Sequence, residues 1–349
     1  MDIDTLDHRL IALLRHDARL PAATLAQKLG VSRGTVTNRL RKLEDGGVIV
    51  GYAVPDKAKS RNLVDAFCEG AKGRRALDIG VLHPGDVAFY GVTEALAHIW
   101  RQARKQGRNW WAMDNAYIDV CREQFFRLSV NRWQHFGTGQ GSPVRLQRVI
   151  DLYKATTKPF EIRTWRRSGS YILLVPQSDK FMSLNAERPG NWVADTTKIL
   201  RQYTDREIRV KPWQRDKARF YEAFPAAVKD AWAVVTWSSA SAQSATFLGV
   251  PAFVTATDCI ARPWCNTDLA KIETPAPEVD RWAFAAMLAK WQFTINELRS
   301  GLAYRTCMEE CWNDQGMVLD PRETGRPHAG EPVEGARPVV AESPRQASA

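Results

Sequence analysis

The stretch LDHRLIALLRHDARLPAATLAQKLGVSRGTVTNRLRKLEDGGVIVGYAV, residues 6–54, carries the longest structural pattern of the chain. Apolar residues recur at helical spacing in its first third: Leu6, Leu10, Leu13 and Leu14. One face of a helix is therefore apolar while the opposite face is charged. The pattern predicts a first helix that packs against the rest of a small domain.

Two more helices and a strand are predicted in the same stretch. A short helix over 22–29 ends at Gly30, because glycine readily adopts the left-handed conformation that terminates helices. Ser32 is a preferred N-cap and opens a third helix, whose apolar side holds Val36, Leu40 and Leu43. A turn over 45–47 and a β-branched run over 48–54 complete a winged helix-turn-helix.

Residues 6–54 resemble the leucine-responsive regulator/AsnC family, in which LAQKLGVS, TVTNRLRKLE and GVIVGY occur in this order and spacing. The resemblance implies that the third helix enters the major groove of double-stranded DNA. The implied DNA-binding residues are Ser32 at the helix start, Arg33, Thr35, Thr37 and Asn38 toward bases, and Arg39, Arg41 and Lys42 toward phosphates. The alternative is the solvated face of a protein-interaction domain.

Composition favours a polyanionic partner. The 349 residues carry a net charge of +10 with a pI near 9.4, and the basic residues extend beyond the first 54. No apolar run approaches 18 residues, so we expect no membrane span and a cytoplasmic protein. The six cysteines have no regular spacing and no histidine at ligand spacing, which predicts reduced thiols and no metal site.

The chain departs from the AsnC family after Val54, because nothing there resembles the amino-acid-binding domain of that family. We expect a DNA-binding domain over 1–54, a basic linker over 55–76, an N-terminal α/β lobe over 77–165, a second lobe over 166–318 and a disordered tail over 319–349. One winged helix covers only a half-site, and the sequence leaves open whether the chain dimerises.

Short apolar strands alternate with helical stretches in the predicted body. A strand over 86–91, a helix over 93–105 and a strand over 110–113 form a β-α-β unit. Asp114 follows the second strand, at the edge where open α/β sheets bind ligands. The alternation returns over 171–237, so the fold class is α/β with two Rossmann-like lobes.

The run WAVVTWSSASAQSATFLGVPAFV, residues 232–254, is the sharpest local signal of the body. A buried strand leads into a turn at Ser238 and Ser239 and then into a helix that ends at Gly249. The free amides and dipole of a helix N-terminus favour an anion such as phosphate. The alternative is that these serines only cap the helix.

With this run, the body resembles the donor-binding half of GT-B glycosyltransferases, including capsule- and teichoic-type transferases, and uncharacterised phage proteins that carry MDNAYI, KPW and VVTWSSASAQSATFLGVP in this order. The resemblance implies a nucleotide-sugar ligand whose phosphates are held by Ser238, Ser239, Ser241, Arg209 and Lys211. It implies Asp114 as the base for an acceptor hydroxyl.

Two features qualify that resemblance. Many such transferases place a ribose-binding glutamate where this chain has Ser244, so the body could bind a nucleotide sugar without turning it over. Asp114, followed by Asn115, could equally be a turn residue, and Arg209 and Lys211 could be ordinary charges of a strand edge. Three tryptophans are candidates for a site lining, because indole rings stack on sugars and bases: Trp213, Trp237 and Trp264.

Three functions are compatible with the sequence. The first is sequence-specific DNA binding and transcription regulation, with a body that binds a phosphorylated ligand resembling a nucleotide sugar. The second is a glycosyltransferase that uses the winged helix for localisation. The third is a protein in which both modules only bind partners. No cofactor other than the nucleotide sugar is expected.

Overall fold

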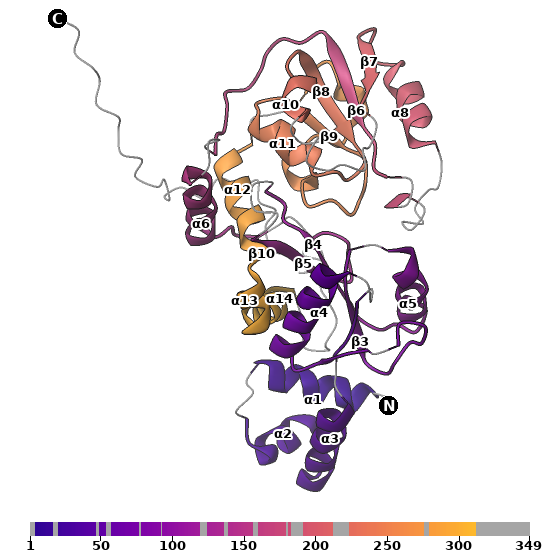
Figure 1. Ribbon diagram of the computed structural model, residues 1–349, viewed down its shortest axis with the longest axis vertical. Helices are drawn as coiled ribbons and strands as arrows, with labels where there is room; N and C mark the ends of the chain where they lie inside the picture. Colours follow the sequence, from indigo (N-terminus) through magenta and orange to yellow (C-terminus); the bar gives the residue numbers. More distant parts are fainter. Residues whose placement is uncertain are drawn as a thin grey trace, which may run out of the picture.

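The computed structural model describes residues 4–16, 20–46, 49–53, 57–76, 78–91, 93–118, 124–135, 139–155, 160–178, 181–182, 191–211, 223–275 and 279–311. Figure 1 shows a small helical domain at one end of the molecule, a first α/β lobe next to it, and a second α/β lobe at the other end. The tail expected over 319–349 lies outside the described residues.

The helical domain has the predicted elements: α1 (Thr5–His16), α2 (Ala22–Leu29) and α3 (Arg33–Gly46). Its core consists of side chains that the apolar spacing predicts, among them Leu10, Leu25, Val36 and Leu43. Gly30 ends α2 with a φ of 67°, the left-handed conformation that the sequence requires there. The turn between α2 and α3 is therefore a consequence of local sequence.

The first lobe is built on a mixed sheet, here called sheet A, with the strand order β10-β5-β4-β3-β1-β2 among the described residues. Its strands are β1 (Ile49–Tyr52), β2 (Arg74–Arg75), β3 (Asp86–Tyr90), β4 (Trp110–Asn115), β5 (Phe126–Val130) and β10 (Gln292–Phe293). The first four are parallel, whereas β5 and β10 are antiparallel to their neighbours. The helices of its chain segment are α4 (Ala58–Gly70), α5 (Glu94–Lys105) and α6 (Pro143–Lys154).

Two predictions for residues 48–76 are wrong: a wing strand that belongs to the helical domain, and a linker without secondary structure. The strand expected as a wing is β1, which pairs with β2 on one side and with β3 on the other inside sheet A. Residues 58–70 of the expected linker form α4, and Leu63, Val64 and Phe67 are buried. The charged residues of this helix make the segment polar on average, although its apolar residues recur at helical spacing. The lobe therefore begins at Ile49.

The second lobe contains a fully parallel sheet, here called sheet B, with the order β7-β6-β8-β9. Its strands are β6 (Tyr171–Val175), β7 (Glu207–Val210), β8 (Ala231–Thr236) and β9 (Ala252–Val254). Its helical elements are α8 (Trp192–Leu200), α10 (Phe224–Ala227), α11 (Ser241–Phe247), η2 (Arg262–Trp264) and η3 (Leu269–Lys271). All five residues of β6 are buried, as expected for a central strand covered on both faces.

The last described helices return to the first lobe: α12 (Arg281–Lys290), α13 (Ile295–Arg299) and α14 (Leu302–Cys311). Between α12 and α13, β10 pairs with β5 of sheet A. Gly70 and Gly301 lie where α4 and α13 approach so closely that a Cβ on either would overlap backbone atoms of the other segment. The expected second lobe over 166–318 is thus too long, since its last part completes sheet A.

Candidate functional site

The exposed face of α3 holds the first group of candidate residues. Arg33, Thr37, Asn38 and Lys42 are exposed, while Val36 of the same helix is buried in the domain core. Arg33 and Thr37 lie four residues apart, as do Asn38 and Lys42, so each pair shares one side of α3. Together the four side chains cover the exposed half of the helix opposite Val36, here called the polar strip. The strip has the composition expected of a surface that contacts base edges and phosphates.

The start of α3 is fixed by two hydroxyl residues. The amide of Thr35 donates to Ser32 Oγ at 3.0 Å, and the two hydroxyls lie 2.8 Å apart. Ser32 therefore acts as the N-cap that the sequence predicts. Thr37 Oγ1 donates to the carbonyl of Arg33 at 3.0 Å, which leaves its oxygen able to accept a further hydrogen bond.

Arg39 does not belong to the exposed strip. Its guanidinium contacts Asp7 Oδ1 and Asp4 Oδ1, each at 2.7 Å, and the Asp7 side chain is fully buried. Hydrogen bonds to Asp7 and Asp4 raise the pKa of Arg39. The side chain joins α3 to α1 through this ion pair, and its contact with a phosphate stays a prediction. The side chain of Arg41 lies outside the described residues.

Both sheets contain a position at which ligands of parallel α/β folds bind. In sheet A, β1 lies between β2 and β3, and in sheet B, β6 lies between β7 and β8. In each sheet, the second strand along the chain pairs with one edge of the first strand, and the third strand along the chain pairs with its opposite edge. Ligands of such sheets bind beyond the carboxyl ends of the strands at this reversal point.

Ser238 lies at the reversal point of sheet B, just after β8. Its side chain is buried, and its Oγ accepts a hydrogen bond from Gln177 Nε2, which follows β6, at 2.9 Å. The carbonyl of Ser238 accepts from Gln134 Nε2 of the first lobe at 2.6 Å. Ser238 therefore joins two strand ends to the other lobe.

Ser239 and Ser241 form a local pair at the start of α11. The amide of Ser241 donates to Ser239 Oγ at 3.2 Å, and the two hydroxyls lie 3.1 Å apart. Ser241 is buried, whereas Ser239 is partly exposed. The structure thus brings the three predicted serines together, and Ser239 is the most accessible of them.

Of the same predicted set, Arg209 lies in the edge strand β7 and Lys211 follows that strand. Arg209 lies over the Tyr171 ring at 3.9 Å and is paired with Glu207 at 2.7 Å, away from the end of the strand. Lys211 follows β7 and donates its amide to Leu174, and burial lowers the pKa of its ammonium. Only Lys211 lies at the same sheet edge as Ser238, with β6 between their strands.

Asp114 lies at the carboxyl end of β4 and is partly exposed. Its Oδ2 accepts from Arg127 at 2.9 Å, and its Oδ1 accepts from the amide of Asn115 at 2.7 Å. The carboxylate is therefore held in place on both oxygens. Lys59 was missed because it fell in the expected linker, yet its ammonium lies 3.5 Å from Asn115 Oδ1 and 5.1 Å from the centre of the Phe126 ring.

The two lobes meet at a junction formed by residues 131–135 of the first lobe and by the ends of β8 and β9. Arg132 Nε contacts Asp258 Oδ1 at 3.1 Å, and the amide of Ile260 donates to Gln134 Oε1. Phe181 packs between Trp133 of the first lobe and Trp237 of the second. Trp237 is thus buried at this lobe junction.

Tyr117 connects Asp114 to the lobe junction. Its hydroxyl accepts from the amide of His135 at 2.9 Å, and the guanidinium of Arg127 lies 5.2 Å from its ring. Burial raises the pKa of the Tyr117 hydroxyl, which stays protonated at neutral pH. The Asp114–Arg127 pair therefore lies on the first-lobe side of the junction that contains Ser238.

The described residues contain no group of three or more histidine, cysteine or acidic side chains that could hold a metal. Burial raises the pKa of the Cys259 and Cys265 thiols to about 12. Of the three candidate tryptophans, Trp213 lies outside the described residues and Trp264 lines a separate cavity at the opposite edge of sheet B.

Sequence comparison identifies the first segment, since residues 3–44 match the model of the AsnC-type helix-turn-helix domain. The N-terminal segment is an AsnC-type helix-turn-helix domain. An uncharacterised HTH-type transcriptional regulator of Pyrococcus furiosus is 50% identical over 54 residues, which cover 16% of this chain and 36% of the relative. The regulatory protein AsnC of Haemophilus influenzae is 42% identical over 53 residues, 15% of this chain and 35% of that protein. The chain spans about a third of the length of these relatives.

Two solved structures match over most of the chain, both from Thermosulfurimonas dismutans KpsC. Its β-Kdo 2,4 transferase has a TM-score of 0.42 and 12% identity, covering 75% of this chain and 98% of the transferase. Its β-Kdo 2,7 transferase has a TM-score of 0.42 and 11% identity, covering 73% of this chain and 98% of the transferase.

Among the described residues, no helix is long and apolar enough to span a bilayer.

Proposed function

We propose that this protein binds double-stranded DNA through α3 and acts as a transcription regulator. The observation that carries the proposal is the exposed strip of Arg33, Thr37, Asn38 and Lys42 on a helix whose other side packs in a three-helix core. Of the relatives that share this segment, one is named an HTH-type transcriptional regulator and another a regulatory protein. Arginine and asparagine form bidentate contacts with guanine and adenine, and lysine supplies charge to phosphates.

The binding test uses duplexes selected by the full chain from a random library, with affinity measured by fluorescence anisotropy. Arg33→Ala and Asn38→Ala should each weaken binding to the selected duplex by about 1–3 kcal/mol and relax its sequence preference. Lys42→Ala should weaken binding to every duplex and lower the salt dependence by about one phosphate contact. Lys105→Ala, an exposed lysine of α5, is the matched control.

Two results would contradict the proposal. One is a full chain that selects no sequence over random duplex at moderate salt. The other is an Arg33→Ala, Asn38→Ala double variant whose affinity and selectivity equal those of the unchanged protein. Salt-dependent binding without sequence preference would reflect only the net charge of +10.

A second candidate function concerns the lobe junction. We infer that it binds a nucleotide sugar, because the reversal point of sheet B places Ser238 and Ser239 beyond the carboxyl ends of two parallel strands. Lys211 follows the neighbouring edge strand and supplies a positive charge for the donor phosphates. In a transfer reaction, the fixed carboxylate of Asp114 would accept the proton of an acceptor hydroxyl as the nucleoside phosphate leaves.

A panel of sugar nucleotides tests this second function. A bound donor should raise the unfolding temperature of the full chain, and Ser239→Ala should reduce that increase. Turnover is measured as release of nucleoside mono- or diphosphate, which Asp114→Asn should abolish while Asp151→Asn, on an exposed aspartate of α6, should preserve it. Stabilisation without turnover would favour ligand sensing over catalysis. If no sugar nucleotide stabilises the protein and none is turned over, both ligand sensing and catalysis are contradicted.

A further inference from the structure

The second lobe contains a cavity of about 690 Å³ at the edge of sheet B where the strands begin. Trp232 is the second residue of β8 and Ala252 is the first residue of β9, and both line this cavity. The strand continues for four residues from Trp232 to Thr236, a distance of roughly 13 Å, and Ser238 follows its far end. The cavity is therefore separate from the lobe junction, and its volume is that of a small-ligand site.

Three tryptophans contribute to the lining, and each is held by a neighbour: Trp165 and Trp232, which are partly exposed, and Trp264, which is buried. Trp232 Nε1 donates to the carbonyl of Ile272 at 2.7 Å, and Arg206 lies 4.2 Å from the centre of the ring. Arg281 lies 4.3 Å from the Trp165 ring, and Trp264 stacks on Phe284 at 5.3 Å. Rings fixed in this way can receive the apolar face of a ligand without losing further side-chain freedom.

The cavity lining contains three positively charged side chains, Arg166, Arg167 and Lys271, and two negatively charged ones, Asp268 and Glu273. Glu273 is neutralised by Arg206 at 3.0 Å. Arg166 donates to the carbonyls of Val228 and Ala231, which are neutral groups and do not cancel its charge. The ammonium of Lys271 is exposed and forms no ion pair with any part of the chain that the structure describes. A negatively charged group on a ligand would therefore be stabilised at this rim.

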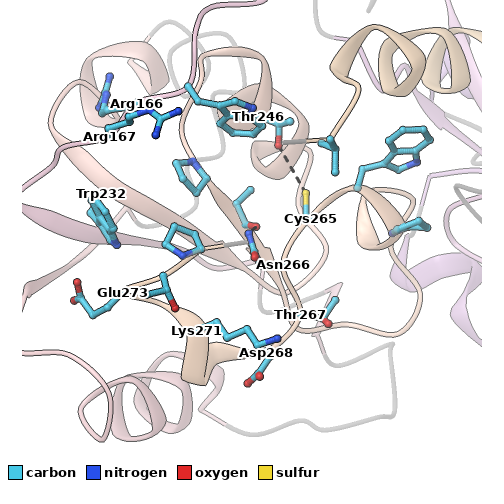
Figure 2. Close-up of a pocket in the computed structure, with 18 residues that line it drawn as sticks. Arg166, Arg167, Trp232, Thr246, Cys265, Asn266, Thr267, Asp268, Lys271 and Glu273 are labelled. Carbon is cyan, nitrogen blue, oxygen red and sulfur yellow. Dashed lines mark hydrogen bonds between the residues drawn. The ribbon is translucent and has the colours of Figure 1, made fainter. Parts of the chain in front are cut away.

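Polar groups for hydroxyl recognition lie between the indoles and the rim. Figure 2 shows Cys265 and Asn266 in the middle of the lining, with Trp232 on one side and Lys271 and Asp268 below them. Asn266 Nδ2 donates to the carbonyl of Ala252 at 3.3 Å, which orients the amide. Burial raises the pKa of the Cys265 thiol to about 12, so it adds no negative charge at neutral pH.

We propose that this cavity binds an anionic saccharide, a sugar ring that carries a phosphate or a carboxylate. The sugar ring would pack on the indoles of Trp165 and Trp232. Its hydroxyls would bond to Asn266 and Asp268, and its anionic group would face Lys271. A neutral sugar lacks the charge interaction, and inorganic phosphate lacks the ring. The site is distinct from the proposed DNA-binding helix and from the lobe junction.

The test measures binding to the full chain by calorimetry and tryptophan fluorescence, with glucose 6-phosphate and glucuronate as probes. At least one of them should bind tenfold or more tightly than glucose and inorganic phosphate. Lys271→Ala should weaken that binding at least fivefold, Lys271→Arg should largely preserve it, and Thr267→Glu should weaken it by adding a negative charge at the exposed rim. Lys105→Ala should leave it unchanged.

Three results would overturn the proposal: no binding of either anionic sugar, binding unchanged by Lys271→Ala and Thr267→Glu, or preference for uridine monophosphate over both sugars. The last result would identify a nucleotide site instead. Both substituted side chains are exposed, and unfolding curves of the variants establish that they remain folded.

Discussion

Arg33 and Arg39 lie six residues apart on α3 and have different surroundings. Arg33 is exposed on the polar strip, whereas Arg39 reaches back to Asp7 and Asp4 at the start of α1. Helical spacing separates apolar from polar positions but does not reveal which polar side chain meets a buried carboxylate. The sequence therefore predicted the helix and its cap, but it did not reveal the ion pair between Arg39 and α1.

We predict that Arg39→Ala destabilises the helical domain by about 2 kcal/mol, because it leaves the buried Asp7 carboxylate without its cationic partner. Arg33→Ala should change stability by less than about 0.5 kcal/mol. Denaturant unfolding followed by circular dichroism measures both effects. Equal stability of the two variants would show that the Arg39–Asp7 contact is not a structural ion pair.

At the scale of elements, the unexpected feature is the packing of α4 on β1. Gly51 of β1 faces Val64 and Cys68 of α4, and a Cβ on this glycine would overlap both side chains. Both side chains are buried and have no room to move.

The three helices of the N-terminal domain and the strands of the β8 region could be predicted, because each has a strong local pattern. The partner of β1 could not, since tertiary contacts determine it.

Gly51→Ala is therefore expected to destabilise the first lobe by about 1–3 kcal/mol through overpacking. Gly34→Ala is the matched control, because Gly34 lies in α3 and its Cβ would meet only Ser32 Oγ at 3.7 Å. Alanine should there stabilise the helix by about 0.5–1 kcal/mol. Thermal unfolding of both variants tests the pair, and an unaffected Gly51→Ala protein would argue against the β1–α4 contact.

We expect the stability of the protein to depend on pH through Glu297 of the short helix α13. Its Glu297 forms a capping box with Thr294 and an ion pair with Arg148 at 2.7 Å. Although burial acts to raise the pKa of Glu297, the hydrogen bonds from Arg148 and from the Thr294 amide hold it below its usual value. A lowered carboxyl pKa contributes stability that is present above the unfolded-state pKa, about 4.3, and is lost as pH falls through the folded-state pKa.

Glu297→Gln keeps a side chain that can complete the capping box but removes the charge. We expect it to lower stability by about 1 kcal/mol at pH 7, with a difference that shrinks as pH falls below about 4. Denaturant unfolding at several pH values measures this difference. Glu309→Gln, at an exposed position of α14, should show little change at any of them. A constant difference across pH would exclude the ion pair as its cause.

Across the whole molecule, the helical domain is attached to the body without a separate linker. The chain passes from α3 into β1 within three residues, and α1 also contacts α14. The first lobe closes only when β10 and α13 return from the far end of the chain. Sequence pattern could predict two α/β lobes but not this return, because β10 is a two-residue strand with no pattern of its own.

Two truncations test whether the helical domain ends at Val54, as the sequence predicts, or before Ile49, as the structure shows. Removal of residues 1–46 leaves β1 in place, and the body should still unfold cooperatively. Removal of residues 1–54 deletes a strand that bonds to both β2 and β3, together with Tyr52, whose buried hydroxyl accepts from the amide of His83 at 2.6 Å. The shorter protein should lose cooperative unfolding and aggregate, because two strand edges and an apolar face become exposed. If it folds as well as the longer one, sheet A does not need β1, and the helical domain ends where the sequence pattern places it.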